Sequence, residues 1–244
     1  MRPTASPPVP GFLRYLEREY GIVGVKPFAP PNKLGFHYFT GETPEKKKVF
    51  IKLEGRVERA SAREAFFIRL LRKSGKAGFF PKVLACRTKT PFAFIATEFI
   101  EGQTLEKFLG QNRRDPKIHR PLLEQFCSIL EVLRGAGVIH RDVRPPNLIV
   151  RTKKDPPFLR VVLIDFAYAL RLKPPLGELP FVAANTAILR KLGTGYKPRE
   201  FLWDDAFAFA KIAAETDPCY KENYPEIYSF LSAKTGKLTY AFSG

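Results

Sequence analysis

The sequence predicts an α+β fold of two lobes, a β-rich first lobe with one main helix and a reduced, mostly helical second lobe. Short β-prone runs fill most of residues 22–101, and one segment of helical periodicity interrupts them. After Glu101-Gly102 the apolar residues recur at helical spacing instead. Because clefts between lobes are common ligand sites, we expect a site close to this junction.

The first lobe, residues 22–101, follows an N-terminal extension at residues 1–21. The first ten residues are rich in proline and are expected to be disordered or draped over the surface. A short amphipathic helix is expected at 12–20, and the main helix of the lobe at 57–73. Strands are expected at 36–40, 49–53, 81–87 and 92–100, with turns at 41–48 and 89–91.

The second lobe, residues 102–244, carries helical periodicity at 104–109, 120–135, 204–215 and 225–233. A hairpin that turns at 153–157 is expected to lead into a strand at 160–166. The residues between this strand and 204 are expected to be mostly loop. The helix at 120–135 has an apolar stripe formed by Leu122, Leu123, Phe126, Ile129, Leu130 and Leu133.

Composition excludes a disordered chain, because 45% of the 244 residues are hydrophobic. The net charge is +17, and such a field attracts nucleotides, nucleic acid, phosphorylated sugars or an anionic membrane surface. Charge alone does not choose among these ligands, and a solubility role is the alternative.

The three cysteines, Cys86, Cys127 and Cys219, form no CxxC or Cys/His cluster. Disulfide scaffolding and a structural zinc site are therefore not expected, which fits a reducing compartment. No apolar run approaches the length of a spanning helix. We expect a cytoplasmic protein, with peripheral contact to the inner face of a membrane left open. His37 and His119 lie in polar settings and are expected at the surface.

The stretch at 138–150 combines two short β-prone runs with a polar loop stiffened by two prolines. Within the loop, Asp142 and Asn147 stand five positions apart. One oxygen can accept a proton from an attacking hydroxyl group, while another holds a metal ion beside it.

Asp165 ends the apolar run at 161–165, where an unpaired carboxylate is costly. An aspartate that caps a turn is the plain alternative. A hairpin returns the chain beside its start, however, so Asn147 and Asp165 are expected to face one metal site.

The spacing H-R-D-x-x-x-x-N at residues 140–147 resembles the catalytic loop of protein kinases. Asp165-Phe166-Ala167 resembles their D-F-G motif, with alanine in place of glycine. Lys52, in Val49-Phe50-Ile51-Lys52, resembles the V-A-I-K lysine that holds nucleotide phosphates. The resemblance implies a bilobal protein-kinase-like fold, with a metal-binding segment at 161–167 and an activation-like segment at 168–200.

Glu64 is the best match for the helix glutamate that pairs with this lysine in the family. Two alternatives stand beside this interpretation. Lys52 can be a solvent-facing residue of an alternating strand. Ser61 and Glu64 can instead form a capping box at a helix start.

Residues 97–102 resemble the segment that joins the lobes and contacts adenine, with Thr97 at the gatekeeper position and backbone contacts from Glu98 and Ile100. An ordinary edge strand is the alternative. Asp205 resembles the aspartate that anchors the catalytic loop, although it can equally stabilise a helix start through the dipole. Arg141 is a candidate partner for a phosphorylated Thr186 or Thr194.

Three departures from protein kinases stand out. The sequence has no G-x-G-x-x-G phosphate cover, Arg144 stands where a lysine is usual, and only 39 residues follow Asp205. These features resemble small atypical members, namely the lipopolysaccharide-core (Kdo and heptose) kinases and the RIO/Bud32-like kinases.

The resemblance implies a phosphotransferase that uses ATP and Mg²⁺, with a protein serine or threonine hydroxyl as acceptor. Asp142 would be the catalytic base, and Arg144 would stabilise the transferring group. Lys52, held by Glu64, would position the phosphates, while Asn147 and Asp165 would hold the metal. The alternatives are a kinase for a sugar or glycolipid hydroxyl, a pseudokinase or basic scaffold, and an RNA-associated kinase.

Overall fold

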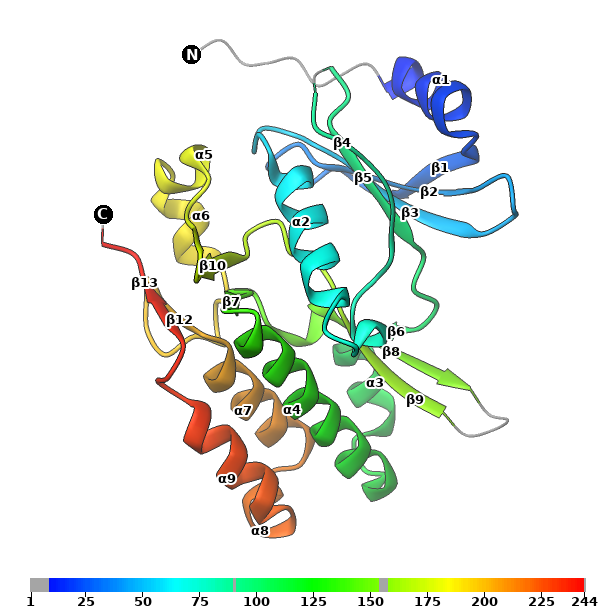
Figure 1. The fold of residues 1–244 in the computed structure, drawn as a ribbon. Helices are drawn as coiled ribbons and strands as arrows, with labels where there is room; N and C mark the ends of the chain where they lie inside the picture. Colours follow the sequence, from blue (N-terminus) through cyan, green and yellow to red (C-terminus); the bar gives the residue numbers. More distant parts are fainter. Residues whose placement is uncertain (1–8, 90, 154–157, 244) are drawn as a thin grey trace.

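The computed structural model describes residues 9–89, 91–153 and 158–243 and has the predicted α+β composition (Figure 1). Residues 1–8 of the proline-rich stretch lie outside the described residues. So do Thr90 in the turn expected at 89–91 and residues 154–157 in the turn expected at 153–157. No helix within the described ranges is both long and apolar enough to cross a membrane.

The N-terminal part is built on a five-stranded antiparallel sheet with the strand order β1-β2-β3-β5-β4. On one face lies α1, whose Phe12 and Leu16 pack against Phe39 and Ile51. Because side chains alternate along a strand, Lys52 points to the opposite face. These elements are α1 (Val9–Tyr20), β1 (Val23–Ala29), β2 (His37–Glu42), β3 (Lys48–Leu53), α2 (Ala60–Arg72), η1 (Ala77–Phe79), β4 (Val83–Arg87) and β5 (Phe94–Glu98).

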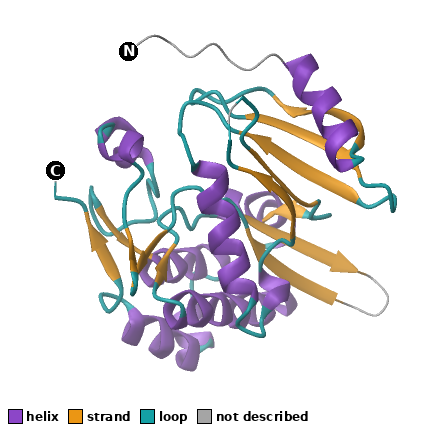
Figure 2. Cartoon of the chain, turned by 45° about the horizontal axis from the view of Figure 1, so that its top comes forward, coloured by secondary structure: helices purple, strands orange, loops and turns teal. Residues whose placement is uncertain are grey.

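The main helix, α2, begins at Ala60, three residues later than predicted. Arg59 adopts a left-handed conformation just before it, and the Ser61 amide donates to the Glu54 carboxylate at 2.8 Å. Glu54 therefore satisfies this helix start, and the alternative of a Ser61–Glu64 capping box is wrong. Figure 2 shows α2 running between the sheet and the helical part.

The C-terminal part is mostly helical, and the predicted stripe of α4 lies buried in its main core. Small sheets join this part together, in the orders β6-β8-β9, β7-β10-β11 and β12-β13. Its first elements are β6 (Gln103–Thr104), α3 (Leu105–Asn112), η2 (Pro116–Ile118), α4 (His119–Gly135), β7 (Val138–Ile139), η3 (Pro145–Asn147), β8 (Leu148–Lys153) and β9 (Phe158–Leu163). The later elements are β10 (Leu170–Leu172), β11 (Pro175–Leu176), α5 (Pro180–Ala183), α6 (Thr186–Lys191), β12 (Leu202–Asp204), α7 (Asp205–Thr216), α8 (Tyr220–Asn223), α9 (Pro225–Lys234) and β13 (Thr239–Ala241).

Residues 168–203 are loop-rich, as expected, although the short elements β10, β11, α5, α6 and β12 also lie there. Two expectations for this part are corrected. The strand expected at 160–166 ends at Leu163. His119 is not a free surface residue, because its ring hydrogen-bonds the Arg113 carbonyl at 2.8 Å and lies 3.4 Å from the Asp217 carboxylate.

Candidate active site

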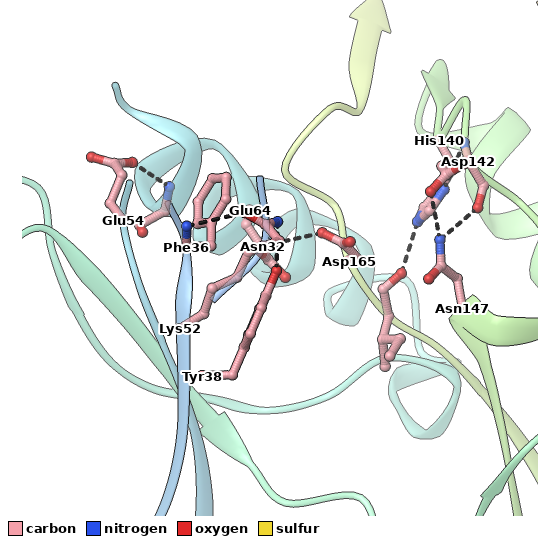
Figure 3. Close-up of polar contacts among 12 residues, drawn as sticks. Asn32, Phe36, Tyr38, Lys52, Glu54, Glu64, His140, Asp142, Asn147 and Asp165 are labelled. Atoms are coloured by element: carbon pink, nitrogen blue, oxygen red, sulfur yellow. Dashed lines mark hydrogen bonds and ion pairs between the residues drawn. The ribbon is translucent and has the colours of Figure 1, made fainter. Parts of the chain in front are cut away.

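Lys52 joins three elements that are far apart in the sequence (Figure 3). From β3, its Nζ atom lies 3.0 Å from Glu64 Oε2 on α2 and 2.7 Å from Asp165 Oδ1, beyond the end of β9. The predicted Lys52–Glu64 ion pair is therefore present, and the alternative of a solvent-facing Lys52 is wrong.

Burial alone would lower the pKa of Lys52, but the carboxylates of Asp165 and Glu64 raise this pKa well above its ordinary value. Burial acts the opposite way on Asp165, and the Lys52 ammonium group outweighs it, so the pKa of Asp165 is lowered. The side chains of Lys52 and Glu64 are 6% and 9% exposed, whereas that of Asp165 is 35% exposed. Asp165 is therefore the most exposed member of this cluster.

Asp165 does not end a strand as predicted, because it lies two residues beyond β9 in a left-handed conformation with φ of 66°. The next side chain, Phe166, is fully buried and fixes this turn. Its ring packs edge-on against His140, with centroids 4.6 Å apart, and against Phe80 at 5.9 Å. Ala167 is also fully buried, in the place of the family's glycine.

The carboxylate of Asp142 is held on both oxygens. Its Oδ2 atom accepts from Asn147 Nδ2 at 2.8 Å and from Arg144 Nε at 3.1 Å. Its Oδ1 atom accepts from the Gly193 amide at 2.8 Å. The loop thus brings the predicted residues Asp142, Arg144 and Asn147 into contact, and a glycine from the activation-like segment completes the set.

His140 connects this loop to the segment that carries Asp165. Its Nδ1 atom accepts from the Asp142 amide at 3.2 Å, so Nε2 carries the proton and donates to the Ile164 carbonyl at 3.0 Å. Burial lowers the pKa of His140, which agrees with this neutral tautomer. The histidine therefore sets the spacing between Asp142 and Asp165.

Asp205 anchors the polar loop at 140–147 through its first two backbone amides, as the resemblance implied. Its carboxylate accepts from the amides of His140 at 2.6 Å and Arg141 at 3.1 Å. Burial raises the pKa of Asp205 to about 7, while these two amides oppose the rise. The N-cap of α7 is Asp204 and not Asp205, because Asp204 accepts from the first amides of the helix.

Arg141 lies in a closed cluster on the far side of the loop. Its guanidinium group pairs with Glu178 and donates from Nε to the Tyr168 carbonyl at 2.7 Å. The rings of Trp203 and Tyr240 cover it, with centroids 5.2 and 5.6 Å from the guanidinium carbon. Tyr240 belongs to β13, so a late strand of the chain helps to enclose Arg141.

Arg141 contacts neither of the two threonines that are candidates for phosphorylation, so its role as a phosphate partner stays a prediction. Glu178 already occupies its guanidinium group. Thr194 is exposed and donates instead to the Lys191 carbonyl at 2.7 Å, and Thr186 is exposed at the start of α6. The partner that the sequence did not reveal is a carboxylate within the same segment.

A cavity of about 450 Å³ lies between the sheet and the loop that carries Asn147. Both Asn147 and Asp165 line it, as do Thr97, Glu98 and Ile100. Its apolar lining includes four aromatic side chains, from Phe28, Tyr38, Phe50 and Phe99.

The backbone of the joining segment is partly committed. The amide of Glu98 donates to the Lys82 carbonyl at 2.9 Å, so this amide is not free for a ligand. Among the described residues, the amide of Ile100 has no hydrogen-bond acceptor. Of the two predicted backbone contacts, Ile100 can offer a donor, and Glu98 can offer only its carbonyl oxygen.

The oxygen atoms of Asn147 and Asp165 suit a magnesium ion. Because Asn147 Nδ2 donates to Asp142, the amide oxygen of Asn147 is its free atom, and it accepts no hydrogen bond within the described ranges. Only Oδ1 of the partly exposed Asp165 carboxylate contacts Lys52. Mg²⁺ commonly takes one or two protein oxygens and completes its shell with water and phosphate. No cluster of three or more His, Cys, Asp or Glu suited to a metal occurs in the described part of the chain.

Comparison with known proteins finds partial matches to serine/threonine-protein kinases. The chain is 37% identical over 79 residues to the serine/threonine-protein kinase pkn3 of Myxococcus xanthus, a match that covers 31% of the chain and 14% of the relative. It is 28% identical over 148 residues to pkn2 of the same organism, covering 61% and 15%. It is 27% identical over 165 residues to the interferon-induced, double-stranded RNA-activated protein kinase of Mus musculus, covering 63% and 29%.

These matches support membership of the chain in the protein-kinase-like superfamily. No family model matches it. The chain spans less than a third of the length of these relatives. The β-rich N-terminal sheet and helical C-terminal part are those of a kinase-like fold.

Several residues of this kinase-like site were not predicted from the sequence. They are Tyr38 in the cavity wall, Gly193 on Asp142, and Glu178 on Arg141. Arg63 is another, because it crosses from α2 to donate to the Ala169 carbonyl at 3.1 Å. The sequence does carry a signal at Gly193, because this residue opens a Gly-Thr-Gly-Tyr run inside the predicted activation-like segment.

Proposed function

We propose that the chain is an ATP-dependent phosphotransferase that moves the γ-phosphoryl group to a serine or threonine hydroxyl of a protein. One observation carries the proposal. Lys52, Asp165 and Asn147 line a single cavity, and Asn147 also holds the carboxylate of Asp142. Residues that can bind phosphates therefore lie close to a residue that can accept a proton. Phosphoryl transfer requires this arrangement, because its catalysis depends mostly on positioning the reacting groups.

In this proposal the nucleotide binds between a first lobe at 22–101 and a second lobe at 102–244. The base lies against Ile149 and Ile164 and meets the free amide of Ile100. Lys52 pairs with the phosphates, because its ammonium group stays charged and Glu64 fixes its direction.

The amide oxygen of Asn147 and the carboxylate of Asp165 would hold the magnesium ion. When bound, it would supply charge neutralisation of the nucleotide phosphates. The chain's own contribution is to keep both oxygens aimed at one space. Asn147 is fixed by Asp142, and Asp165 is fixed by Lys52 and by the buried ring of Phe166.

Asp142 receives the proton of the acceptor hydroxyl group. The Gly193 amide and Asn147 Nδ2 fix the plane of its carboxylate, so the carboxylate is held in one orientation. The Arg144 side chain, 43% exposed and 3.1 Å from Asp142, adds positive charge where the phosphoryl group passes.

A sugar or glycolipid hydroxyl is the second candidate acceptor. The exposed Arg144 favours it, because a cation next to Asp142 would attract an acceptor that carries its own phosphate or carboxylate. The three free cysteines and the net charge of +17 support the proposed cytoplasmic location, with contact to an anionic membrane surface or to RNA as further possibilities. A pseudokinase or basic scaffold is the remaining alternative, and turnover of ATP would exclude it.

The test is phosphoryl transfer from labelled ATP with Mg²⁺ to a panel of protein and glycolipid acceptors. Asp142→Asn keeps the shape of the side chain and removes the proton acceptor. We expect transfer to fall by about 10²- to 10⁴-fold while ATP affinity changes little. Asp115→Asn, at an exposed turn, is the matched control and should behave as wild type. Wild-type transfer by the Asp142→Asn variant would overturn the proposal.

A further inference from the structure

Tyr38 lies where the nucleotide phosphates would enter. On β2 it pairs directly with Lys52 on β3, so the two side chains project from the same face of the sheet. Both line the cavity, and the ring of Tyr38 stacks on that of Phe50 with centroids 6.1 Å apart. Figure 3 shows the phenol beside the Lys52 side chain, near the Lys52–Asp165 contact.

The orientation of the Tyr38 hydroxyl group is set by Asn32. Oδ1 of Asn32 accepts from the amides of Leu34 at 3.0 Å and Phe36 at 3.1 Å, which fixes the direction of the side-chain amide. Nδ2 therefore points the other way and donates to the Tyr38 oxygen at 2.9 Å. Because this oxygen accepts from Asn32, its own proton is directed elsewhere, and no acceptor for it occurs among the described residues.

The same turn explains why a side-chain donor is needed. In a glycine-rich cover, backbone amides face the phosphates. Here the amides of Leu34 and Phe36 are bound by Asn32 Oδ1, and the Gly35 amide donates to the Asn32 carbonyl at 2.9 Å. The three amides nearest the tip of this turn are thus already satisfied. Donors for a phosphate at this end of the cavity must come from side chains.

We propose that the Tyr38 hydroxyl group donates a hydrogen bond to a phosphate oxygen of the bound nucleotide, in place of the amides of a glycine-rich loop. This inference rests on the proposed function, because it takes the ligand to be a nucleoside triphosphate. Burial raises the pKa of Tyr38, so the phenol keeps its proton at neutral pH. Tyr38 would then act with Lys52, one as a neutral donor and the other as a cation.

The test compares ATP with adenosine, which lacks phosphates, in calorimetric binding to wild type and to Tyr38→Phe. A hydrogen bond to a charged group predicts that Tyr38→Phe weakens ATP binding about 10- to 100-fold and leaves adenosine binding unchanged. The variant should fold normally, because water can satisfy the exposed Asn32 amide, and thermal unfolding checks this. Tyr20→Phe is the control, since that ring packs on Phe94 outside the cavity.

The outcomes separate this inference from the function itself. Equal loss of ATP and adenosine affinity would overturn it, because the ring and not the hydroxyl group would then matter to the base. Unchanged ATP affinity in Tyr38→Phe, with wild type binding ATP, would overturn it and leave the proposed function standing. Absence of ATP binding by wild type would overturn both.

Discussion

Two buried cations organise the site, and they differ in what can reach them. Lys52 contacts Glu64 and Asp165, and the Asp165 side chain is 35% exposed to the cavity. Arg141 pairs with Glu178 at side-chain exposures of 1% and 9%, beneath the rings of Trp203 and Tyr240. The first cluster can exchange a carboxylate contact for a ligand, whereas the second can only hold its segments together.

One helix serves both clusters. Adjacent residues of α2 point to different partners, with Glu64 on Lys52 and Arg63 on the Ala169 carbonyl beside the Arg141 cluster. Burial and the nearby Arg141 lower the pKa of Arg63 to about 10, which still leaves it charged at neutral pH. Moving α2 would therefore disturb the two clusters together, while single substitutions should separate them. Breaking the ion pair of the Arg141 cluster should lower the free energy of unfolding. Breaking the ion pairs of the Lys52 cluster should weaken ligand binding.

The largest loss of stability is expected from Glu178→Gln. The Arg141 guanidinium group would stay buried without its counter-charge, and water could not reach it. We expect the free energy of unfolding to fall by about 3–5 kcal/mol, measured by urea denaturation. ATP affinity of the folded fraction should be nearly unchanged. Glu200→Gln is the control, because its pair with Arg190 is exposed and should contribute little. A fall in the free energy of unfolding as small as that of the control would mean that the Arg141–Glu178 pair does not stabilise the fold.

Gly193→Ala should come next, since Gly193 links the closed cluster to Asp142. Its φ is +65°, and a Cβ atom would lie 2.5 Å from the Arg141 carbonyl oxygen and 3.3 Å from the Trp203 ring. The backbone must then move and withdraw the amide from Asp142. We expect a stability loss of about 2–4 kcal/mol and a fall in transfer rate of about 100-fold. ATP affinity, measured by calorimetry, should be preserved.

Gly195→Ala is the matched control for the steric clash that an added Cβ atom at Gly193 would make. Gly195 also has positive φ, at +84°, but apart from its two chain neighbours no atom of the described residues would lie within 4 Å of an added methyl group. This variant should show only the backbone strain of about 1–2 kcal/mol and keep its transfer rate. Equal behaviour of the two variants would show that the contact between Gly193 and Asp142 has no special role.

The accessible cluster was more predictable from sequence than the closed one, for a physical reason. Asp142 and Asn147 are five residues apart, and one hairpin joins Asn147 to Asp165, so local backbone rules bring them together. Lys52 lies on a strand whose alternation fixes its face. The spacing of Glu64 was compatible with two structures, and only the cap supplied by Glu54 decided between them.

The closed cluster depends on contacts that no local pattern encodes. Glu178 is 37 residues from Arg141, in a segment whose short strands and helices were expected to be loop. The pairing of β12 with β13, which brings Tyr240 over Arg141, joins strands too short to give a periodic signal. The Asn32–Tyr38 hydrogen bond likewise arises only once the turn before β2 has folded back on itself.

The smallest effect on folding, with a large effect on the ligand, is expected from Lys52→Met. Methionine retains the apolar stem, water can solvate the freed Asp165, and Glu64, whose pKa burial already raises, can take up a proton. We therefore expect a stability loss of only about 1 kcal/mol, well below that of breaking a fully enclosed pair. ATP affinity should fall at least tenfold in calorimetry, because the phosphates lose their cation. Lys48→Met is the control on the same strand, with its ammonium group over the Phe99 ring and away from Asp165.

A stability loss for Lys52→Met that matches Glu178→Gln, with ATP affinity unchanged, would reverse the comparison. Lys52 would then hold the fold together as Arg141 does, and it would not be the cation that binds the nucleotide phosphates.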